Sequence, residues 1–445
     1  MSSNLPLVTY RQLNIAVNTN AESATEAAQG AAANVADDAV EAAAMLTGLN
    51  AALEILRQAD QNLGVMVSPD HKVASLLQTF LAEESAKVGK VEPISGVGGV
   101  GGVGTAFEAK FDEKDWKGWV ESFFTWWKKI VPHTWLDTPS DKRIPNNARL
   151  ALLGDWGTGM YGAPHCAHSI EADEKGYDVL LHLGDVYYSG DKNEVEERFL
   201  NLWPKLEATS WANKESVINR ACNSNHEMYT GGHSYFNKTL SKFEQSASYF
   251  ALHNDHYILA GLDTAYKRKD LAEGQVEWLS ELVRHAAGRR VILFSHHQPF
   301  SWFEAGHPKI TAKLGELLGG QKIFAWYWGH EHRCILYQKH PAYGLYGRCV
   351  GHSGYPYFRD DLEGHVVSEE KTDGARWYRV GAKNLSPGAL VLDGPNKYMK
   401  EDEVAKYGPN GYMTLDFDGE RLTEVVHAAD GKELYQRLIT DIDHD

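Results

Sequence analysis

The sequence predicts an α/β protein in which two packed mixed sheets flanked by helices follow an all-α N-terminal arm. Short apolar runs that end in Gly-Asp, at 149–155 and 177–185, are typical of buried strands in an α/β sheet. Beyond them, strand-like and helical stretches alternate. Residues 21–90, in contrast, are rich in Ala, Leu and Glu and carry helical spacing of their apolar residues.

The composition of the 445 residues argues against several classes of partner. A formal net charge of −16 disfavours non-specific binding to nucleic acid or to an anionic membrane. Four scattered cysteines are too few for a disulfide framework, and we expect free thiols. Neither a signal-peptide pattern nor a run of about 20 apolar residues is present, so we expect a cytoplasmic protein without stable membrane insertion.

Residues 1–92 are predicted to form a helical arm, most simply a helical hairpin with its turn at 68–70. Apolar residues recur at three- and four-residue spacing over 35–63 and again over 73–81. Because the arm holds no cluster of ligand-type residues, we expect it to be dispensable for chemistry. Packing or homo-oligomer formation is its leading role, and a regulatory cap over the active site is the alternative.

Residues 93–147 are predicted to be a Gly/Val linker followed by an aromatic helix. The stretch 96–104 formally contains GxGxxG, but Pro93 precedes it and the Gly-Val pattern repeats, which favours a flexible linker over a phosphate-binding loop. The Trp- and Phe-rich stretch 116–131 predicts a helix whose aromatic face packs on the protein's own core. A helix lying on a membrane surface is the alternative.

The third segment, 148–445, is predicted to be the catalytic domain. Turns that follow its strand-like runs supply potential metal ligands: Asp155, Asp185 with Tyr188, Asn225-His226, His296-His297 and His330-Glu331-His332. Because strands of an α/β sheet end at one edge, we expect these groups to converge there. This set of carboxylate, imidazole, amide and phenolate groups suits two metal ions that share one carboxylate. Both ions can then bind the oxygens of a phosphate. Residues 355–405 read as an irregular insertion near the site, and 412–427 as a β-hairpin.

The five ligand blocks, in this order, resemble the metallophosphoesterase (calcineurin-like) superfamily over about residues 148–430. The variant closest to GDWG and GDVYY is the purple acid phosphatase family, especially its tartrate-resistant type. Position 157 is Gly where the superfamily commonly has a metal-binding His, and Tyr188 stands where purple acid phosphatases place a metal-binding Tyr. The resemblance implies an αββα sandwich that hydrolyses small phosphorylated substrates.

Carried over residue by residue, the resemblance implies two metal ions bridged by Asp185. The first ion would be bound by Asp155, Asp185, Tyr188 and His332, a hard set that suits Fe(III). The second would be bound by Asp185, Asn225, His296 and His330, which suits a divalent ion such as Zn, Mn or Fe(II). Either His296 or His297 could face the metal, and we favour His296 because the family's ligand directly follows the strand.

The same resemblance implies a catalytic role for His226, which would contact the phosphate and protonate the leaving group while a metal-bound hydroxide attacks. Substrate contacts are expected from Asn225, His226, His233 and His297. Phosphomonoesters are the leading substrates. The alternatives are a phosphodiesterase acting on cyclic nucleotides or other diesters, and a non-catalytic binding or scaffold protein, which would normally have lost one of the ligand blocks.

Overall fold

The computed structural model describes most of the chain. The described residues are 5–8, 12, 21–58, 71–87, 91–94, 106–109, 116–206, 217–272, 274–359, 362, 364–372, 375–383, 385–399 and 401–439. The predicted turn at 68–70 and the Gly-Val stretch 96–104 lie outside these residues.

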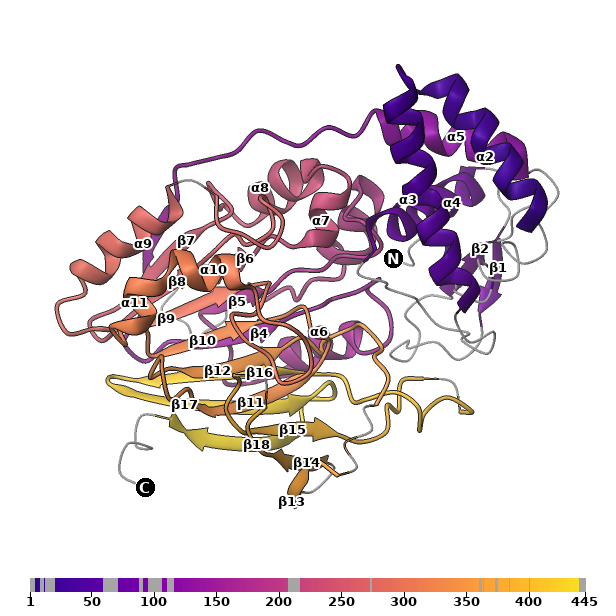
Figure 1. Ribbon diagram of the computed structural model, residues 1–445. Coiled ribbons are helices and arrows are strands. Elements are labelled where there is room, and N and C mark those ends of the chain that lie inside the picture. Colours follow the sequence, from indigo (N-terminus) through magenta and orange to yellow (C-terminus); the bar gives the residue numbers. More distant parts are fainter. Residues whose placement is uncertain are drawn as a thin grey trace.

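Two mixed sheets packed face to face form the main body of the molecule (Figure 1). The ten-stranded sheet has the order β13 (Val366–Thr372), β14 (Ala375–Val380), β15 (Ala389–Asp393), β11 (Cys334–Lys339), β12 (Tyr346–Val350), β10 (Ala325–Trp328), β9 (Arg290–Ser295), β8 (Tyr257–Gly261), β7 (Phe250–His253), β3 (Ser140–Arg143). The six-stranded sheet has the order β18 (Glu433–Leu438), β17 (Arg421–Ala428), β16 (Gly411–Asp418), β4 (Arg149–Leu153), β5 (Val179–His182), β6 (Ile218–Ala221).

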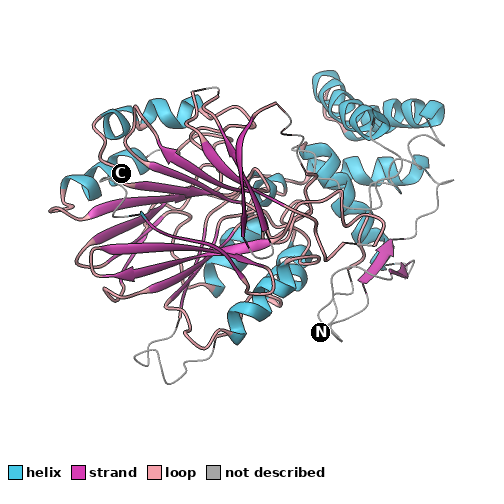
Figure 2. Cartoon of the chain, turned by 90° about the horizontal axis from the view of Figure 1, so that it is seen from below, coloured by secondary structure: helices cyan, strands magenta, loops and turns pink. Residues whose placement is uncertain are grey.

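Alternating side chains explain why both faces of each sheet are covered. In β4, Leu150 and Leu152 point into the core between the sheets, whereas Ala151 and Leu153 pack outward with helix α6 (Ala163–Ala172). The outer face of the larger sheet is covered by α9 (Gln275–Arg284), α10 (Pro308–Lys313) and α11 (Gly315–Gly319). Figure 2 shows the stacked sheets with helices on their outer sides. The predicted two-sheet sandwich is confirmed.

Strands β4, β5 and β6 run parallel, so their carboxyl ends meet at one edge. Strands β9 and β10 are parallel in the other sheet and supply the later ligand turns. The short helix α7 (Asn225–Tyr229) follows β6, and the remaining helical segments there are Glu194–Leu200, Tyr235–Thr239 and α8 (Leu240–Lys242). This arrangement gathers every predicted ligand block on one side of the sandwich.

Two C-terminal predictions have different outcomes. The hairpin is confirmed, because β16 and β17 pair antiparallel with Asp418 opposite Arg421. The prediction that 355–405 is irregular is wrong in part, because β13, β14 and β15 extend the ten-stranded sheet. Polar residues hide the alternation in the edge strand β13, whereas β15 is a short, buried apolar run inside the sheet. All four cysteines are free and buried, as expected.

The N-terminal arm is more elaborate than a hairpin. It contains α2 (Ala21–Val35), α3 (Ala39–Gln58), α4 (Lys72–Lys87) and a two-stranded pair of β1 (Val91–Ile94) with β2 (Ala106–Ala109). The aromatic helix α5 (Trp116–Lys128) packs into the same apolar cluster, and its Phe123 contacts Phe80 of α4 with ring centroids 5.7 Å apart. The aromatic face therefore packs on the protein's own core. None of the described helices is long and apolar enough to cross a membrane.

Candidate metal centre

The two Gly-Asp turns lie side by side at the carboxyl ends of β4 and β5. The N–H of Asp155 donates to the carbonyl of Gly184, and the N–H of Gly157 donates to the carbonyl of Asp185, each at 3.0 Å. A Cβ atom at Gly184, where φ is +100°, would lie 2.7 Å from the Cβ of Ser224, so only glycine allows this packing. Both Asp side chains are fully buried as a result.

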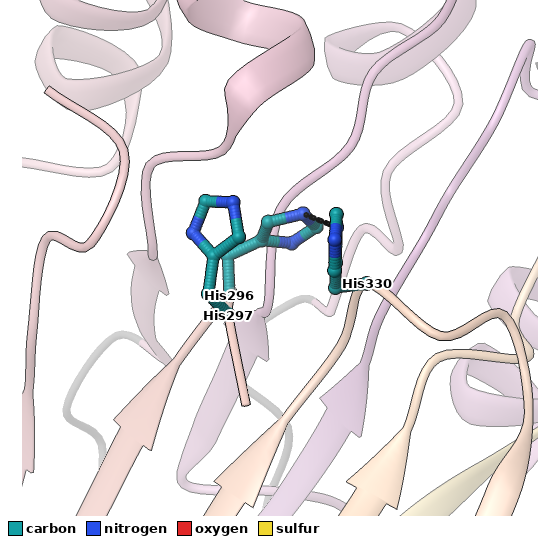
Figure 3. Close-up of side chains that lie close together, drawn as sticks. All are labelled: His296, His297 and His330. Atoms are coloured by element: carbon teal, nitrogen blue, oxygen red, sulfur yellow. Dashed lines mark hydrogen bonds between the residues drawn. The ribbon is translucent and has the colours of Figure 1, made fainter. Parts of the chain in front are cut away.

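One group of ligand atoms surrounds the Oδ1 atom of Asp185. The Nε2 atom of His296 lies 3.2 Å from that oxygen, 3.0 Å from Oδ1 of Asn225 and 3.1 Å from Nδ1 of His330. Nδ1 of His296 donates to the carbonyl of Leu183 at 2.9 Å, which leaves Nε2 for a metal. Figure 3 shows a ring nitrogen of His296 directed toward a ring nitrogen of His330. Separations of about 3 Å are those between ligands that share one ion.

A second group of ligand atoms surrounds the Oδ2 atom of Asp185. The hydroxyl of Tyr187 donates to Oδ2 at 3.1 Å and lies 3.0 Å from Nε2 of His332. That nitrogen is 3.4 Å from Oδ1 of Asp155 and 3.7 Å from Oδ2 of Asp185. Asp185 therefore contributes one oxygen to each group, which is the geometry required of a carboxylate that bridges two metal ions.

The backbone at these positions is unusual. Four ligand residues have left-handed conformations: Asp155 (φ 55°), Asp185 (φ 75°), His330 (φ 68°) and His332 (φ 53°). Non-glycine residues seldom adopt positive φ, and such conformations persist where the surrounding structure imposes them, often at functional sites. Their concentration in one small volume marks this sheet edge as a functional site.

The shifted pKa values of the Asp155 and Asp185 carboxyl groups are also consistent with a site that binds a cation. Burial and the neighbouring Asp185 carboxylate raise the pKa of Asp155 well above its usual value. Burial opposes the charge of Asp185, yet nearby His296 and His226 hold its pKa well below the usual range. The Oδ2 atom of Asp155 is buried and has no hydrogen-bond partner among the described residues. A metal ion would satisfy that oxygen and relieve the repulsion between the carboxylates.

Tyr188 does not lie where the sequence placed it. Its hydroxyl accepts a hydrogen bond from the N–H of Val8 at 2.9 Å and lies 3.2 Å from the carbonyl of the same residue. Its ring packs beside the guanidinium of Arg198. The two side chains point in different directions: Tyr187 faces the carboxylates and Tyr188 faces the N-terminal segment. The hydroxyl that reaches the Asp185 carboxylate is thus that of Tyr187, not that of Tyr188 as expected, and metal binding by a tyrosine stays a prediction.

His226 is held against the same turn from the opposite side. Its Nδ1 atom lies 2.6 Å from the carbonyl oxygen of Tyr188, and because a carbonyl only accepts, Nδ1 carries the hydrogen. The imidazole stacks on the ring of Tyr187 at a centroid distance of 3.9 Å and contacts the ring of Tyr229 at 4.7 Å. These contacts fix the orientation of the His226 ring at the edge of the ligand groups.

A cavity of about 330 Å³ opens over the second ligand group. Its lining includes the predicted residues Asp185, Asn225, His226, His330 and His332. The lining also includes Tyr187, Glu304 and Arg333, which sequence reasoning missed, together with Glu331 of a predicted ligand block and residues 355–359 of the insertion expected near the site. The run Tyr355-Pro356-Tyr357-Phe358-Arg359, aromatic and basic within a polar region, was the available signal. The lining carries two arginines, of which Arg359 is paired with Asp393, and three acidic residues, Asp185, Glu304 and Glu331.

Two predicted substrate contacts are not brought to this cavity. His233 lies 2.9 Å from the carbonyl of Val131 through its Nε2 atom, on the surface beside His133. His297 is fully buried, and its Nδ1 lies 2.9 Å from the hydroxyl of Thr264. Figure 3 shows His297 beside His296, away from the hydrogen bond to His330. Neither residue is among those that line this cavity, so their contact with substrate stays a prediction. The ring centroids of His297 and His330 are 4.7 Å apart, and His297 could share a metal ion with His296 and His330.

Residues 148–334 match the family model of the calcineurin-like phosphoesterases. The candidate ligand groups described above all lie within these residues, the part of the chain that is similar to calcineurin-like phosphoesterases. No curated protein matches the chain significantly.

Several solved structures are similar in fold. One is the purple acid phosphatase PPD1 of yellow lupin (Lupinus luteus), with 14% identity and a TM-score of 0.45 over 66% of this chain and 54% of the lupin chain. Another is a dimetal phosphatase of Danio rerio, with 12% identity and a TM-score of 0.38 over 66% and 98% of the chains. The third is PhoD, with 9% identity and a TM-score of 0.40 over 69% and 70%. The match thus spans about half of the lupin protein.

Proposed function

We propose that this protein hydrolyses phosphate monoesters with the help of two bound metal ions, as purple acid phosphatases do. The observation that carries the proposal is the carboxylate of Asp185, which offers one oxygen to each of two ligand groups beside a cavity. When bound, the ions supply Lewis acidity and lower the pKa of a water molecule that can act as the nucleophile.

The two groups differ in chemical character. Asp155, Asp185, Tyr187 and His332 form a set with three acidic oxygens, which suits Fe(III). Asp185, Asn225, His296 and His330 form a set richer in neutral donors, which suits Zn, Mn or Fe(II). When Tyr187 takes the place of Tyr188 in the first set, the set still contains a tyrosine hydroxyl. Such a tyrosine is the feature by which the sequence resembles purple acid phosphatases.

His226 has the position of a proton donor. It lines the cavity beside Asn225, and its ring orientation is set by the carbonyl of Tyr188 and by the face of Tyr187. With Nδ1 engaged, Nε2 of the protonated imidazole can contact a phosphoryl oxygen and donate its proton to the departing alcohol. Arg333, also in the lining, adds positive charge on the side where the ester group would lie.

The purified protein should contain close to two metal ions per chain, including iron, and should hydrolyse 4-nitrophenyl phosphate faster than bis(4-nitrophenyl) phosphate. Elemental analysis and steady-state assays with iron, zinc and manganese measure both quantities. One zinc per chain without iron would contradict the phenol-bearing site. A higher kcat/KM for the diester would favour the alternative, a phosphodiesterase.

The visible absorption of the iron-loaded protein should distinguish Tyr187 from Tyr188. A phenolate bound to Fe(III) gives a charge-transfer band in visible light, so Tyr187→Phe should abolish the band of the iron-loaded protein. Tyr188→Phe is the matched control, since its hydroxyl contacts Val8 and not the carboxylates, and this variant should keep the band. Absorption spectra of both variants at equal iron content provide the measurement. Bleaching by Tyr188→Phe alone would restore the original prediction for Tyr188.

A further inference from the structure

The N-terminal segment Leu5–Val8 is buried against the catalytic domain. The guanidinium of Arg198 donates to the carbonyls of Leu5 at 3.3 Å and Pro6 at 2.6 Å. The amide of Gln78 in α4 donates to the carbonyl of Val8 at 3.2 Å. The segment is thus held from both sides, by the arm and by the catalytic domain.

Tyr188 connects this segment to His226. Its hydroxyl accepts from the N–H of Val8 and lies within hydrogen-bond distance of the carbonyl of Val8, while its own carbonyl accepts from Nδ1 of His226. The same Arg198 that binds the segment lies 3.5 Å from the carbonyl of Tyr187 through Nη1. A shift of the segment would therefore move the turn that sets the orientation of His226 and Tyr187.

The arm supports the site at two further points. Tyr229 packs into the apolar cluster of the arm, and its hydroxyl accepts from Nδ2 of Asn225 at 2.9 Å, which turns Oδ1 of Asn225 toward His296. Thr79 of α4 lies 2.7 Å from the hydroxyl of Ser189, the residue after Tyr188. The turn that contains Tyr188 and the helix that begins at Asn225 therefore both contact the arm.

We propose that the N-terminal arm is a positioning element of the active site, and that the contact between Val8 and Tyr188 sets the orientation of His226. This inference rests on the proposed function and reverses the expectation that the arm is dispensable for chemistry. It also gives Tyr188 a role, because a tyrosine at this position holds the arm with its side chain and the catalytic imidazole with its carbonyl.

The full-length variants Val8→Pro and Val8→Ala form a matched pair. Both replace the buried valine side chain by another apolar group, but only proline removes the N–H that donates to Tyr188. With an alkyl phosphate, Val8→Pro should lower kcat about 10- to 100-fold relative to Val8→Ala, since a misplacement of about 1 Å can cost 10²-fold. Metal content and Tm should agree between the two variants. Equal kcat values at equal metal content would overturn the proposal.

A double-mutant cycle tests whether the effect passes through His226. If Val8 acts by orienting this imidazole, adding Val8→Pro to His226→Ala should cost no further activity, because the group being positioned is already gone. Losses that multiply in the double variant would show that the arm acts elsewhere and would overturn the assignment of Val8 to His226.

A measurement without substrate separates this inference from the proposed function. In the zinc-loaded protein, the hydrogen-bonded Nδ1 proton of His226 should give a downfield NMR resonance in Val8→Ala that is lost or shifted in Val8→Pro. If that difference is present but no phosphate ester is hydrolysed, the positioning contact stands and the proposed function falls. If hydrolysis occurs and the resonance is identical in the two variants, the positioning contact falls.

Discussion

Asp185→Asn should leave neither metal site functional. The carboxylate contributes Oδ1 to the group of His296, Asn225 and His330 and Oδ2 to the group of Tyr187 and His332. An amide offers one neutral oxygen, so it cannot bridge two cations or neutralise their charge. We expect well below one metal ion per chain and a loss of kcat/KM of at least about 10⁴-fold, which corresponds to about 5.5 kcal/mol in barrier.

Asp155→Asn is the matched control for this change. Asp155 approaches only the group that contains His332, and its Oδ1 accepts from the N–H of His330 at 3.0 Å. Its amide variant should therefore lose one ion and keep the other. Metal content by elemental analysis, with circular dichroism to confirm folding, gives the comparison. Two ions retained in Asp185→Asn would exclude a bridging role, and with it the two-metal proposal.

His226→Ala should keep both metal ions and slow turnover of an alkyl phosphate by about 10²–10⁴-fold, the usual range for loss of a positioned acid or base. The imidazole lines the cavity and is bound by a backbone carbonyl, and it is not a member of either ligand group. Removing it therefore takes away a proton donor and a phosphate contact without opening a coordination position.

Two substrates with different leaving groups separate proton donation by His226 from positioning of the phosphate. A nitrophenolate departs without help, so the loss in His226→Ala should be smaller for 4-nitrophenyl phosphate than for an alkyl phosphate if His226 donates a proton. Steady-state rates for both esters, together with metal content, give the result. An equal loss on both esters would indicate phosphate positioning, and loss of metal would make His226 itself a ligand.

Much of the fold follows from local patterns that the sequence carries. Runs such as Leu150–Leu153 and Val291–Ser295 have the length and composition of buried strands, and a polar residue directly after a parallel strand must lie at the carboxyl edge of its sheet. Asp155, Asp185, Asn225 and the two later histidine turns were therefore brought together as predicted. The β-hairpin at the C-terminal end follows equally from strand alternation and an Asp-Gly turn.

The choice between adjacent residues was decided by tertiary structure. Neighbouring side chains in a turn project to different sides, and a pattern of residue types does not say which side is the site. Tyr187 reaches Asp185 while Tyr188 reaches Val8, and His296 joins the ligand group while His297 contacts Thr264. In each pair, the residue in the ligand group and the residue that packs elsewhere are adjacent in the sequence.

What the sequence by itself determined is the two-sheet sandwich, the kinds of ligand at its edge and their order along the chain, because strand periodicity and turn residues act over a few positions. Only the tertiary structure decided that the arm takes part in the site. The contact between Val8 and Tyr188 joins residues 180 positions apart, and no local pattern encodes such a pairing. It exists because folding buries the N-terminal segment between α4 and the turn after Asp185, where backbone groups hidden from water must find partners.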